Sequence, residues 1–391
     1  MPIARTDAST ARIAAIARTG CSVIASRVDA LPGIAPVLLR SYDSQRGQGA
    51  PATGPLHSAA FTYDNALAVI ALLACNKRPQ AERIGEALRL AAMNDTRLRD
   101  AYRAGVVVGD KPLQNGWWDA QHKRWIDAAQ QYSGAYQDGT SCGNVAWTAL
   151  ALLALHDATG KTRWRDAAIH LARWVVVHAS DARGAGGFDG GIESFLLVPR
   201  QALWKSTEHN IDLAALFEWL ERISAPGGDW GAQSGRAREF VAAQWDAPSG
   251  HFWMGTMADG ETSLRSPSAL DVQLWAQLLP NAPKKWRRAL GWIERMNAVN
   301  GGFDFTDARD GWWTEGTAQA ALVYRRIGAA AKANTLFVAI TQQVSPGGFL
   351  YATPEPRITA VYSYYHHQPC LAATAWAVLA ALNRNPYLAD S

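Results

Sequence analysis

Six helical segments made almost entirely of apolar residues recur along the chain, and they constrain its fold more than any other feature. A helix that is hydrophobic on all sides has to be buried on all sides. The six segments are residues 64–74, 144–155, 211–220, 270–279, 317–327 and 371–382. The chain therefore needs an interior large enough to bury six helices.

Six amphipathic segments alternate with the apolar ones. They carry Arg and Lys along one face, as at Arg163, Arg165 and Arg173, and they cover residues 10–39, 79–93, 162–178, 234–244, 283–296 and 331–343. Helices that are joined by short turns pack antiparallel. The alternation predicts an all-α fold, an (α/α)6 toroid of six helical hairpins in which an outer ring of amphipathic helices covers an inner ring of apolar ones.

Gly-aromatic segments separate the later hairpins. They are Gly186-Gly187-Phe188, Gly250-His251-Phe252-Trp253, Gly301-Gly302-Phe303 and Gly347-Gly348-Phe349. They recur about every 45 to 65 residues, which is the length of two helices with their loops. Because each inner helix is followed by an antiparallel outer partner, all six inner helices run in the same direction. We expect their N-termini to gather at one end, together with these loops and short β-hairpin insertions.

We predict a single domain over residues 1–391, with its longest insertion, residues 101–140, forming a lid or groove wall. No run of 18 apolar residues lacks a charge, so no membrane span is expected. The net charge is +4 and no run of five Lys or Arg residues occurs, which argues against a nucleic-acid partner. We expect a monomer.

The four cysteines form no CxxC pair, so zinc-ribbon spacing is absent. Cys21 and Cys75 lie in helical patterns and are expected to be free, small, buried side chains. Cys142 and Cys370 each precede a predicted inner helix, which would allow them to meet near the site, although sequence alone does not predict a disulfide. We expect no cofactor and no metal ion.

Residues 1–27 contain neither a continuous apolar core nor an A-x-A cleavage pattern. The sequence therefore leaves two expectations for the location of the protein. It is cytoplasmic, or it is periplasmic or secreted if an export signal has been removed.

Ionisable and aromatic residues are concentrated just before and at the start of the predicted inner helices. Asp, Ser and Thr are common helix caps, which is a sufficient explanation for Asp64, Ser268 or Thr317 taken singly. Capping does not explain Glu208-His209-Asn210 or Trp312-Trp313-Thr314-Glu315. Several buried carboxylates at one end of a ring require protons, cations or substrate hydroxyls as partners.

Three acids, Asp64, Glu208 and Glu315, are the candidate catalytic residues. A pair of carboxyl groups suits the cleavage of glycosidic bonds, because one protonates the leaving oxygen while the other activates water or attacks carbon. We predict Glu315 and Glu208 as this pair and Asp64 as the third candidate. Asp138 is the substitute if one of these is only a cap. Further acids that we expect near the same face are Asp119, Asp189 and, one turn inside its helix, Asp212.

The 17 tryptophans supply aromatic surface for binding sugar rings. Trp117 and Trp118 adjoin Asp119 in the long insertion, Trp312 and Trp313 precede Glu315, and Trp253 ends a Gly-aromatic segment. Tyr63 is next to Asp64. The full set of predicted substrate-binding residues is Tyr63, Trp117, Trp118, Asp119, Asp138, His209, Asn210, Trp253, Trp312, Trp313, His366 and Gln368.

The histidines leave alternatives open. His209, His366 and His367 lack the i, i+4 spacing of a zinc-binding helix. As proton-transfer groups they would suit a sugar epimerase or a polysaccharide lyase, in which Arg357 and Tyr364 would neutralise a uronate carboxylate and abstract a proton. A carbohydrate-binding toroid without catalysis is a further alternative, because a fold does not by itself imply an activity.

The twelve-helix pattern, the acids at the inner-helix starts and the Trp-rich loops resemble the six-hairpin glycosidases. The likeness covers roughly residues 10–382, with family-type motifs at Gly143-Asn144-Val145-Ala146-Trp147, Thr207-Glu208-His209-Asn210-Ile211-Asp212 and Trp313-Thr314-Glu315-Gly316-Thr317. The resemblance implies an (α/α)6-barrel hydrolase that acts on a bacterial or plant polysaccharide or oligosaccharide. The adjacent Asp-Asp pair of the α-1,6-mannanase branch is absent.

Prenyltransferase β-subunits and terpene cyclases share the toroid and the Gly-Gly-Phe segments. A class II cyclase would need an Asp-x-Asp-Asp run, which the sequence lacks. A prenyltransferase would need an Asp, a Cys and a His as zinc ligands, and Cys370 with His366 matches this ligand set poorly.

Overall fold

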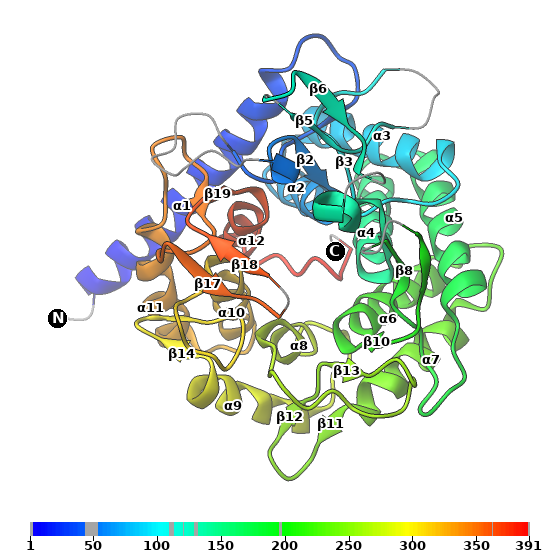
Figure 1. The fold of residues 1–391 in the computed structure, drawn as a ribbon. Helices are drawn as coiled ribbons and strands as arrows, with labels where there is room; N and C mark the ends of the chain where they lie inside the picture. The colour runs from blue at the N-terminus through cyan, green and yellow to red at the C-terminus, as the bar shows by residue number, and fades with distance from the viewer. Residues whose placement is uncertain are drawn as a thin grey trace.

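A computed structural model describes residues 3–43, 54–108, 113–119, 121–128, 132–194, 198–361 and 363–389. Within these ranges twelve α-helices form two concentric rings (Figure 1). The inner ring consists of α2 (Thr62–Ala74), α4 (Cys142–Thr159), α6 (Thr207–Arg222), α8 (Leu270–Trp275), α10 (Thr314–Arg326) and α12 (Leu371–Ala381). The all-α toroid that the sequence predicts is confirmed.

The outer ring covers the inner one with amphipathic helices. It consists of α1 (Ile3–Asp29), α3 (Arg78–Asn94), α5 (Thr162–Ala179), α7 (Trp230–Ala243), α9 (Arg288–Met296) and α11 (Ala330–Thr341). The 3-10 helix η4 (Lys284–Arg287) leads into α9. Burial follows the two rings: every residue of α12 is buried, whereas α5 buries only one face.

The helix bounds differ from the sequence prediction mainly at the start of the inner helices. The predicted segment 211–220 begins at Thr207, and the predicted segment 317–327 begins at Thr314. The polar residues that were expected just before these helices therefore lie in their first turns. The fourth inner helix ends at Trp275 rather than at residue 279, and the first outer helix ends at Asp29 rather than at residue 39.

Short antiparallel strands lie between the helices. Three two-stranded pairs involve the first half of the chain: β1 (Val37–Leu38) with β4 (Gly105–Val106), β2 (Ala59–Phe61) with β3 (Ala101–Arg103), and β5 (Trp117–Asp119) with β6 (Arg124–Ile126). A three-stranded sheet joins β7 (Thr140–Ser141), β8 (Gly191–Glu193) and β9 (Arg200–Ala202). The 3-10 helices η1 (Gly54–Leu56) and η3 (Tyr132–Asp138) flank this region.

Five further pairs complete the strand set of the described residues: β10 (Lys205–Ser206) with β13 (Gly255–Thr256), β11 (Trp245–Asp246) with β12 (His251–Phe252), β14 (Ala298–Val299) with β15 (Gly302–Phe303), β16 (Leu350–Tyr351) with β19 (Pro369–Cys370), and β17 (Arg357–Thr359) with β18 (Tyr364–His366). Strands β2, β7, β10 and β19 each run directly into an inner helix. Their pairing therefore fixes where those helices begin.

A polar residue at the fourth position of five inner helices anchors the segment that precedes the helix hairpin. Its side-chain oxygen accepts a hydrogen bond from a backbone amide of that segment, at 2.8 to 3.0 Å. The five pairs are Asn65 with Leu39, Asn210 with Phe188, Gln273 with Phe252, Thr317 with Phe303, and Thr374 with Leu350. Three of these partners are the aromatic residues of the Gly-aromatic segments. The repeat thus holds each loop against the top of its inner helix.

Cys21 and Cys75 form a disulfide, so the prediction that both are free was wrong. The bond joins α1 to the residue that follows α2, with the two Cα atoms 5.8 Å apart. No sequence pattern indicates this bond, because the two residues are 54 positions apart and meet only in the folded ring. Cys142 and Cys370 are free and buried.

The predicted insertion contributes β3 to β6 and η3, with residues 109–112, 120 and 129–131 outside the described ranges. Its role as a lid or groove wall stays a prediction. None of the helices in the described ranges combines the length and apolar character that crossing a membrane requires.

Candidate active site

The N-termini of the inner helices converge on a cavity of about 270 Å³. Each inner helix contributes at least one residue to its wall. The lining residues are Tyr42, Phe61, Tyr63, Asp64, Gly143, Asn144, Trp147, Glu208, His209, Asp271, Trp275, Phe305, Trp313, Glu315, Tyr365, Cys370 and Ala372. The parallel direction of the inner helices is what brings these distant segments together.

Four carboxyl groups line the cavity, and each comes from the first turn of a different inner helix. Asp64 lies on α2, Glu208 on α6, Asp271 on α8 and Glu315 on α10. A helix N-terminus favours negative charge, but burial penalises it, and here burial has the larger effect. The cavity can therefore hold both protonated and ionised carboxyl groups near neutral pH.

Burial raises the pKa of all four acids. It raises the pKa of Asp271 to about 6, that of Asp64 to about 7 and that of Glu315 to about 8. The pKa of Glu208 rises well above its ordinary value, first through burial and then through the charges of Asp271, Asp212 and Glu315. The spread in pKa gives the cavity a proton donor and a proton acceptor at the same pH.

Glu315 is held by hydrogen bonds from two neighbouring side chains. The hydroxyl of Tyr63 donates to Oε1 of Glu315 at 2.6 Å, and Nε2 of Gln319 donates to the same oxygen at 3.3 Å. The indole of Trp376 donates in turn to the Tyr63 hydroxyl at 2.9 Å. This chain of hydrogen bonds crosses from α12 through α2 to α10 and fixes the direction of the Glu315 carboxyl group.

Glu208 has no hydrogen bond or ion pair with any other residue in the part of the chain that the structure describes. Its carboxyl group lines the cavity beside His209. Burial lowers the pKa of His209 to about 4, so the imidazole is neutral at pH 7. Gly143 makes room for this ring, because a Cβ atom there would lie 2.6 Å from Cδ2 of His209. Glu208 and His209 are both only partly buried, so a ligand in the cavity can contact them directly.

Asp271 is a site residue that the sequence analysis missed. The polar residues Ser266 and Ser268 before the fourth inner helix drew attention away from the helix itself. Asp271 is the second residue of α8, as Glu208 and Glu315 are of their helices. Applying the same positional rule to α8 would have found it. Tyr42, Phe305 and Tyr365 were also missed, because they lie outside the helices, Tyr365 on strand β18.

Six of the predicted site residues lie together in the cavity wall: Tyr63, Asp64, Glu208, His209, Trp313 and Glu315. Trp313 stacks on Tyr365, with ring centres 5.3 Å apart, and meets Phe305 edge to face at 4.9 Å. These three rings form an aromatic wall next to Glu315. Trp312, the neighbour of Trp313 in sequence, does not line the cavity; it is buried against Gly302.

The predicted residues of the long insertion lie away from the cavity lining. Trp117 is buried in a small cluster with Ile126 and Ala128, whereas Trp118 is 47% exposed on the opposite face of the β5–β6 hairpin. Asp119 pairs with His122 in the same hairpin. Their proposed contact with substrate requires a ligand that extends beyond the cavity.

Asp138 is buried in an ion cluster rather than in the cavity wall. It pairs with Arg97, at 2.9 Å, and with Arg99, and it accepts hydrogen bonds from Asn115 and Ser194. Arg97 also donates to the hydroxyl of Thr140 at 2.8 Å, at the start of β7, which leads into α4. The structure therefore gives Asp138 a positioning role at one inner-helix start.

The other predicted substrate-binding residues also lie outside the cavity lining. Asn210 anchors Phe188, Trp253 packs against His251 and Arg265, His366 is exposed on β18, and the backbone carbonyl of Gln368 accepts a hydrogen bond from Ala352. Arg357 stacks over the exposed ring of Tyr364, with its guanidinium carbon 4.5 Å from the ring centre. His367 stacks on Tyr351.

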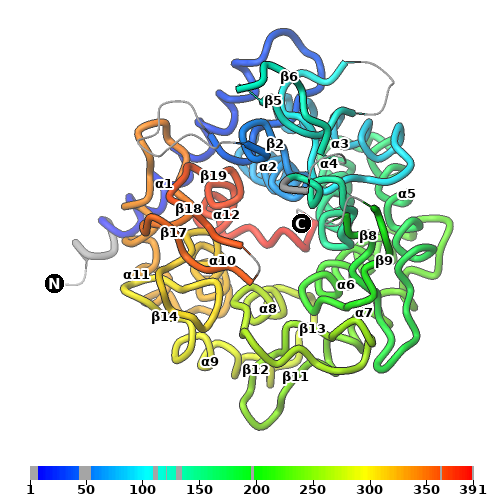
Figure 2. Tube along the Cα trace, in the orientation of Figure 1, coloured from blue at the N-terminus to red at the C-terminus, as the bar shows by residue number. Residues whose placement is uncertain are grey.

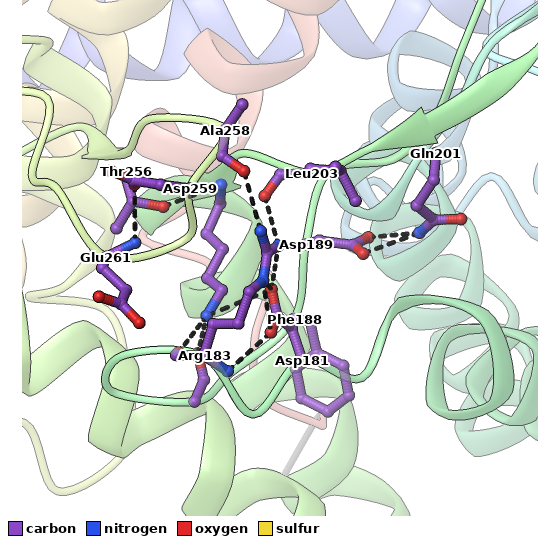
Figure 3. Close-up of polar contacts among 12 residues, drawn as sticks. Asp181, Arg183, Phe188, Asp189, Gln201, Leu203, Thr256, Ala258, Asp259 and Glu261 are labelled. Carbon is purple, nitrogen blue, oxygen red and sulfur yellow. Dashed lines mark hydrogen bonds and ion pairs between the residues drawn. The ribbon is translucent and has the colours of Figure 1, made fainter.

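A buried lysine fixes the loop that leads to α6. Nζ of Lys205, whose side chain is fully buried, donates to the carbonyls of Arg183 and Gly186 at 2.6 and 2.9 Å and pairs with Asp181 at 3.4 Å. The guanidinium of Arg183 pairs with Asp181 and donates to the carbonyls of Ala258 and Leu203 (Figure 3). Lys205 lies three residues before Glu208, so this cluster helps to position Glu208.

Asp189, expected near the site, lies in the same loop and not in the cavity. Its carboxylate accepts hydrogen bonds of 2.8 Å from Gln201 (Figure 3) and burial raises its pKa to about 6. Within the described ranges, no three His, Cys, Asp or Glu side chains are grouped so as to hold a metal ion.

Solved structures share this fold across nearly the whole chain. A glycosidase variant in complex with glucose superimposes with a TM-score of 0.62 at 14% identity, over 96% of this chain and 97% of that chain. A cellobiose 2-epimerase from Spirochaeta thermophila has a TM-score of 0.60 at 12% identity, over 88% and 91% of the two chains. A GH76 α-mannanase from Bacteroides thetaiotaomicron has a TM-score of 0.59 at 12% identity, over 94% and 95%.

These likenesses confirm the (α/α)6 fold that the sequence predicts, and at 12–14% identity they show the fold alone. No protein-family model matches the sequence, and no curated protein matches it. The chemistry of the cavity therefore has to be argued from its own residues.

Proposed function

We propose that the protein is a glycoside hydrolase that cleaves glycosidic bonds of an oligosaccharide or polysaccharide by carboxyl-group acid and base catalysis. The observation that carries the proposal is the convergence of four carboxyl groups, one from each of four inner helices, on one aromatic-walled cavity. Structural neighbours that are glycosidases support it. The aromatic wall of Phe305, Trp313 and Tyr365 provides faces against which a sugar ring can stack.

Glu315 is the general acid in this proposal. Its pKa of about 8 keeps it protonated at pH 7, and Tyr63 fixes its direction. A general acid that remains protonated at the working pH gives its proton to the leaving oxygen as the glycosidic bond breaks. Asp64 raises the pKa of Glu315 by its charge, which makes Asp64 a positioning and tuning residue.

Glu208 and Asp271 form the basic pair. Repulsion between their charges favours a state in which one carboxyl group is protonated while the other is ionised. The ionised group takes a proton from the water that attacks the anomeric carbon. The new C–O bond forms from water, the bond to the leaving sugar breaks, and the leaving oxygen receives its proton from Glu315. The cycle closes when the base releases the proton that it took from water and Glu315 takes up a proton from solvent, so that atoms and charge balance.

Release of reducing ends tests the proposal. The protein is incubated with glucans, mannans, uronans and their short oligosaccharides, and the products are separated by chromatography. We expect new reducing ends with the wild type and a loss of about two to four decades of rate in Glu315→Gln. Glu261→Gln, which changes an exposed acid of a surface loop, is the matched control and should retain full activity. Equal activity in wild type and Glu315→Gln would refute the proposed acid.

A sugar epimerase is the second candidate, because a neutral His209 lines the cavity. A neutral imidazole can remove a proton from carbon next to a carbonyl group. One structural neighbour is a cellobiose 2-epimerase. Incubation of reducing disaccharides in D2O separates the two functions: an epimerase exchanges a carbon-bound hydrogen and leaves the glycosidic bond intact, whereas a hydrolase cleaves the bond without this exchange.

A further inference from the structure

We infer that the cavity takes a single uncharged sugar residue at the end of a chain and rejects uronic acids and sugar phosphates. The inference rests on the proposed function and specifies its substrate class. It is drawn from three features of the described residues: the charges that line the cavity, the closed floor beneath it and its small volume.

The charge of the lining disfavours anionic ligands. Four carboxyl groups face the cavity, and no Arg or Lys is among the lining residues that the structure describes. A uronate or phosphate would bring a further negative charge into a desolvated site without a partner. Removing an unpaired charge from water is strongly unfavourable, and nearby like charges make it more so.

The cations at this end of the ring are committed to other groups. Arg97 and Arg99 pair with Asp138, Lys205 pairs with Asp181, and Arg357 stacks over Tyr364 outside the cavity. Moving any of them into the cavity would break a buried ion pair or a ring contact. Among the cavity-lining residues that the structure describes, a carboxylate or phosphate group on the ligand therefore has no cationic partner.

The lining suits hydroxyl groups instead. Ionised carboxyl groups accept hydrogen bonds, and sugar hydroxyls donate them. Glu208 has no such donor from the described part of the protein, so a ligand hydroxyl or a water would satisfy it. The aromatic wall beside Glu315 offers the apolar surface on which the C–H face of a pyranose packs.

The floor of the cavity is closed by packed aromatic rings. Trp147 and Trp275 line the cavity and are almost fully buried, and Trp147 contacts Trp376 and Tyr387 with ring centres 5.7 and 5.5 Å away. Tyr387 belongs to the C-terminal segment, which enters the centre of the ring (Figure 2). A polysaccharide therefore cannot thread through the toroid.

The volume limits the ligand to the end of a chain. The cavity of about 270 Å³ lies just below the roughly 300–1,000 Å³ that is usual for pockets of drug-sized ligands. A pocket of this size that is closed at its floor and open at its mouth holds one sugar residue, with the next residue at the mouth. The enzyme should therefore cleave the glycosidic bond of the terminal residue rather than internal bonds.

Aryl glycosides that differ only at C6 test the charge preference. Nitrophenyl glucosides, galactosides and mannosides, in both anomeric forms, are compared with the matching uronides. We expect kcat/KM for the preferred neutral glycoside to exceed that for its uronide by at least about a hundredfold. Equal or faster cleavage of the uronide would overturn the inference while leaving the hydrolase function intact.

A binding experiment separates failure of the inference from failure of the function. Titration calorimetry with Glu315→Gln and methyl glycosides measures recognition without turnover. We expect the neutral methyl glycoside to bind and the matching methyl uronide to show no measurable heat, even if no glycoside is hydrolysed. Tighter binding of the uronide would contradict the inference whatever the reaction.

Oligosaccharides with a blocked non-reducing end test the terminal position. We expect an unblocked chain to release monosaccharide from the first time point, and a chain whose terminal hydroxyls carry a benzylidene group to resist cleavage. Release of internal fragments from the blocked chain would show an open groove and would overturn the terminal assignment.

Discussion

The hydroxyl of Tyr387 lies 2.5 Å from Oδ1 of Asp212, although 175 residues separate them in sequence. Both side chains are buried. Asp212 is four residues after Glu208 on α6, so it lies one turn deeper on the same face of the helix. Its charge is one of the causes that raise the pKa of Glu208. The C-terminal segment, seen at the centre of the ring in Figure 1, thus supports the candidate site from below.

Tyr387→Phe should shift the pH dependence of activity while keeping the ring packed against Trp147. The Tyr387 hydroxyl lowers the pKa of Asp212, so its loss leaves Asp212 neutral over a wider pH range. A neutral Asp212 repels a charge on Glu208 less, and the pKa of Glu208 falls. Because Glu208 and Asp271 titrate as one pair, we expect the acidic limb of kcat/KM, which follows the first proton that the pair loses, to move to lower pH. If the acidic limb of the variant lies at the same pH as that of the wild type, Tyr387 does not influence the pKa of Glu208 through Asp212.

The same variant should lose about 1–2 kcal/mol of unfolding free energy, the usual scale for a lost buried hydrogen bond. Urea denaturation measures this loss. The change in pH profile is the more informative readout, because a purely structural role for Tyr387 would lower stability without moving the limb.

The pH profile of the wild type should be bell-shaped. Activity rises as the basic pair loses its first proton, at the pKa of Asp271 of about 6, and falls as Glu315 loses its proton at about 8. With a nitrophenyl leaving group, which needs little protonation, Glu315→Gln should retain residual activity and lose the alkaline limb. A variant that keeps the alkaline limb would place the general acid elsewhere.

Protein stability should fall with rising pH because of the buried acids. The pKa of Glu315 is about 8 in the folded chain against 4.5 for the free side chain, so the folded state holds a proton that the unfolded state releases. The stability that Glu315 contributes is therefore present below about pH 4.5 and lost progressively up to about pH 8. Each pKa unit corresponds to about 1.4 kcal/mol, which makes the loss on the order of a few kcal/mol.

Glu315→Gln should therefore unfold at higher urea concentration than wild type at pH 8, with a smaller difference at pH 5. Glu261→Gln serves as the control for a surface acid. If Glu315→Gln were destabilised equally at both pH values, burial of an acid in the cavity would not explain its pKa.

Removing the Cys21–Cys75 disulfide should lower stability. Closing a loop of this length contributes up to about 4 kcal/mol through the entropy of the unfolded chain. We expect reducing agent to lower the Tm of the wild type and to leave the Tm of the Cys21→Ser, Cys75→Ser double variant unchanged. A reductant-insensitive wild type would argue that the bond contributes little. A disulfide also favours the periplasmic or secreted alternative for the location of the protein.

The ring of inner helices could be predicted from the sequence, because helices that are buried on all sides need apolar residues along their whole length, as in residues 371–382. The first residues of the inner helices were harder to predict. Glu208 and His209 interrupt the apolar pattern in the first turn of α6, since that turn faces the cavity rather than the core. The pattern therefore placed the beginning of the helix at residue 211.

Contacts between residues far apart in the sequence decide which of the predicted residues reach the cavity, and the sequence pattern does not show these contacts. Trp117 and Trp118 look equivalent in sequence, but the pairing of β5 with β6 turns one toward Ile126 and the other toward solvent. In the sequence Asp138 looks like an acid of the site, but in the structure it forms ion pairs with Arg97 and Arg99. Asp271 is a different case, because its position as the second residue of α8 was visible in the sequence and only the loop before that helix was considered.

The most direct test of the central claim is the rate of the Glu208→Gln, Glu315→Gln double variant compared with the two single variants. Groups that act in one reaction give strongly non-additive losses. We predict a loss of about two to four decades of kcat/KM in each single variant and little further loss in the double variant. Wild-type rates in both single variants, or losses that multiply in full, would contradict a shared acid and base site at the inner-helix starts.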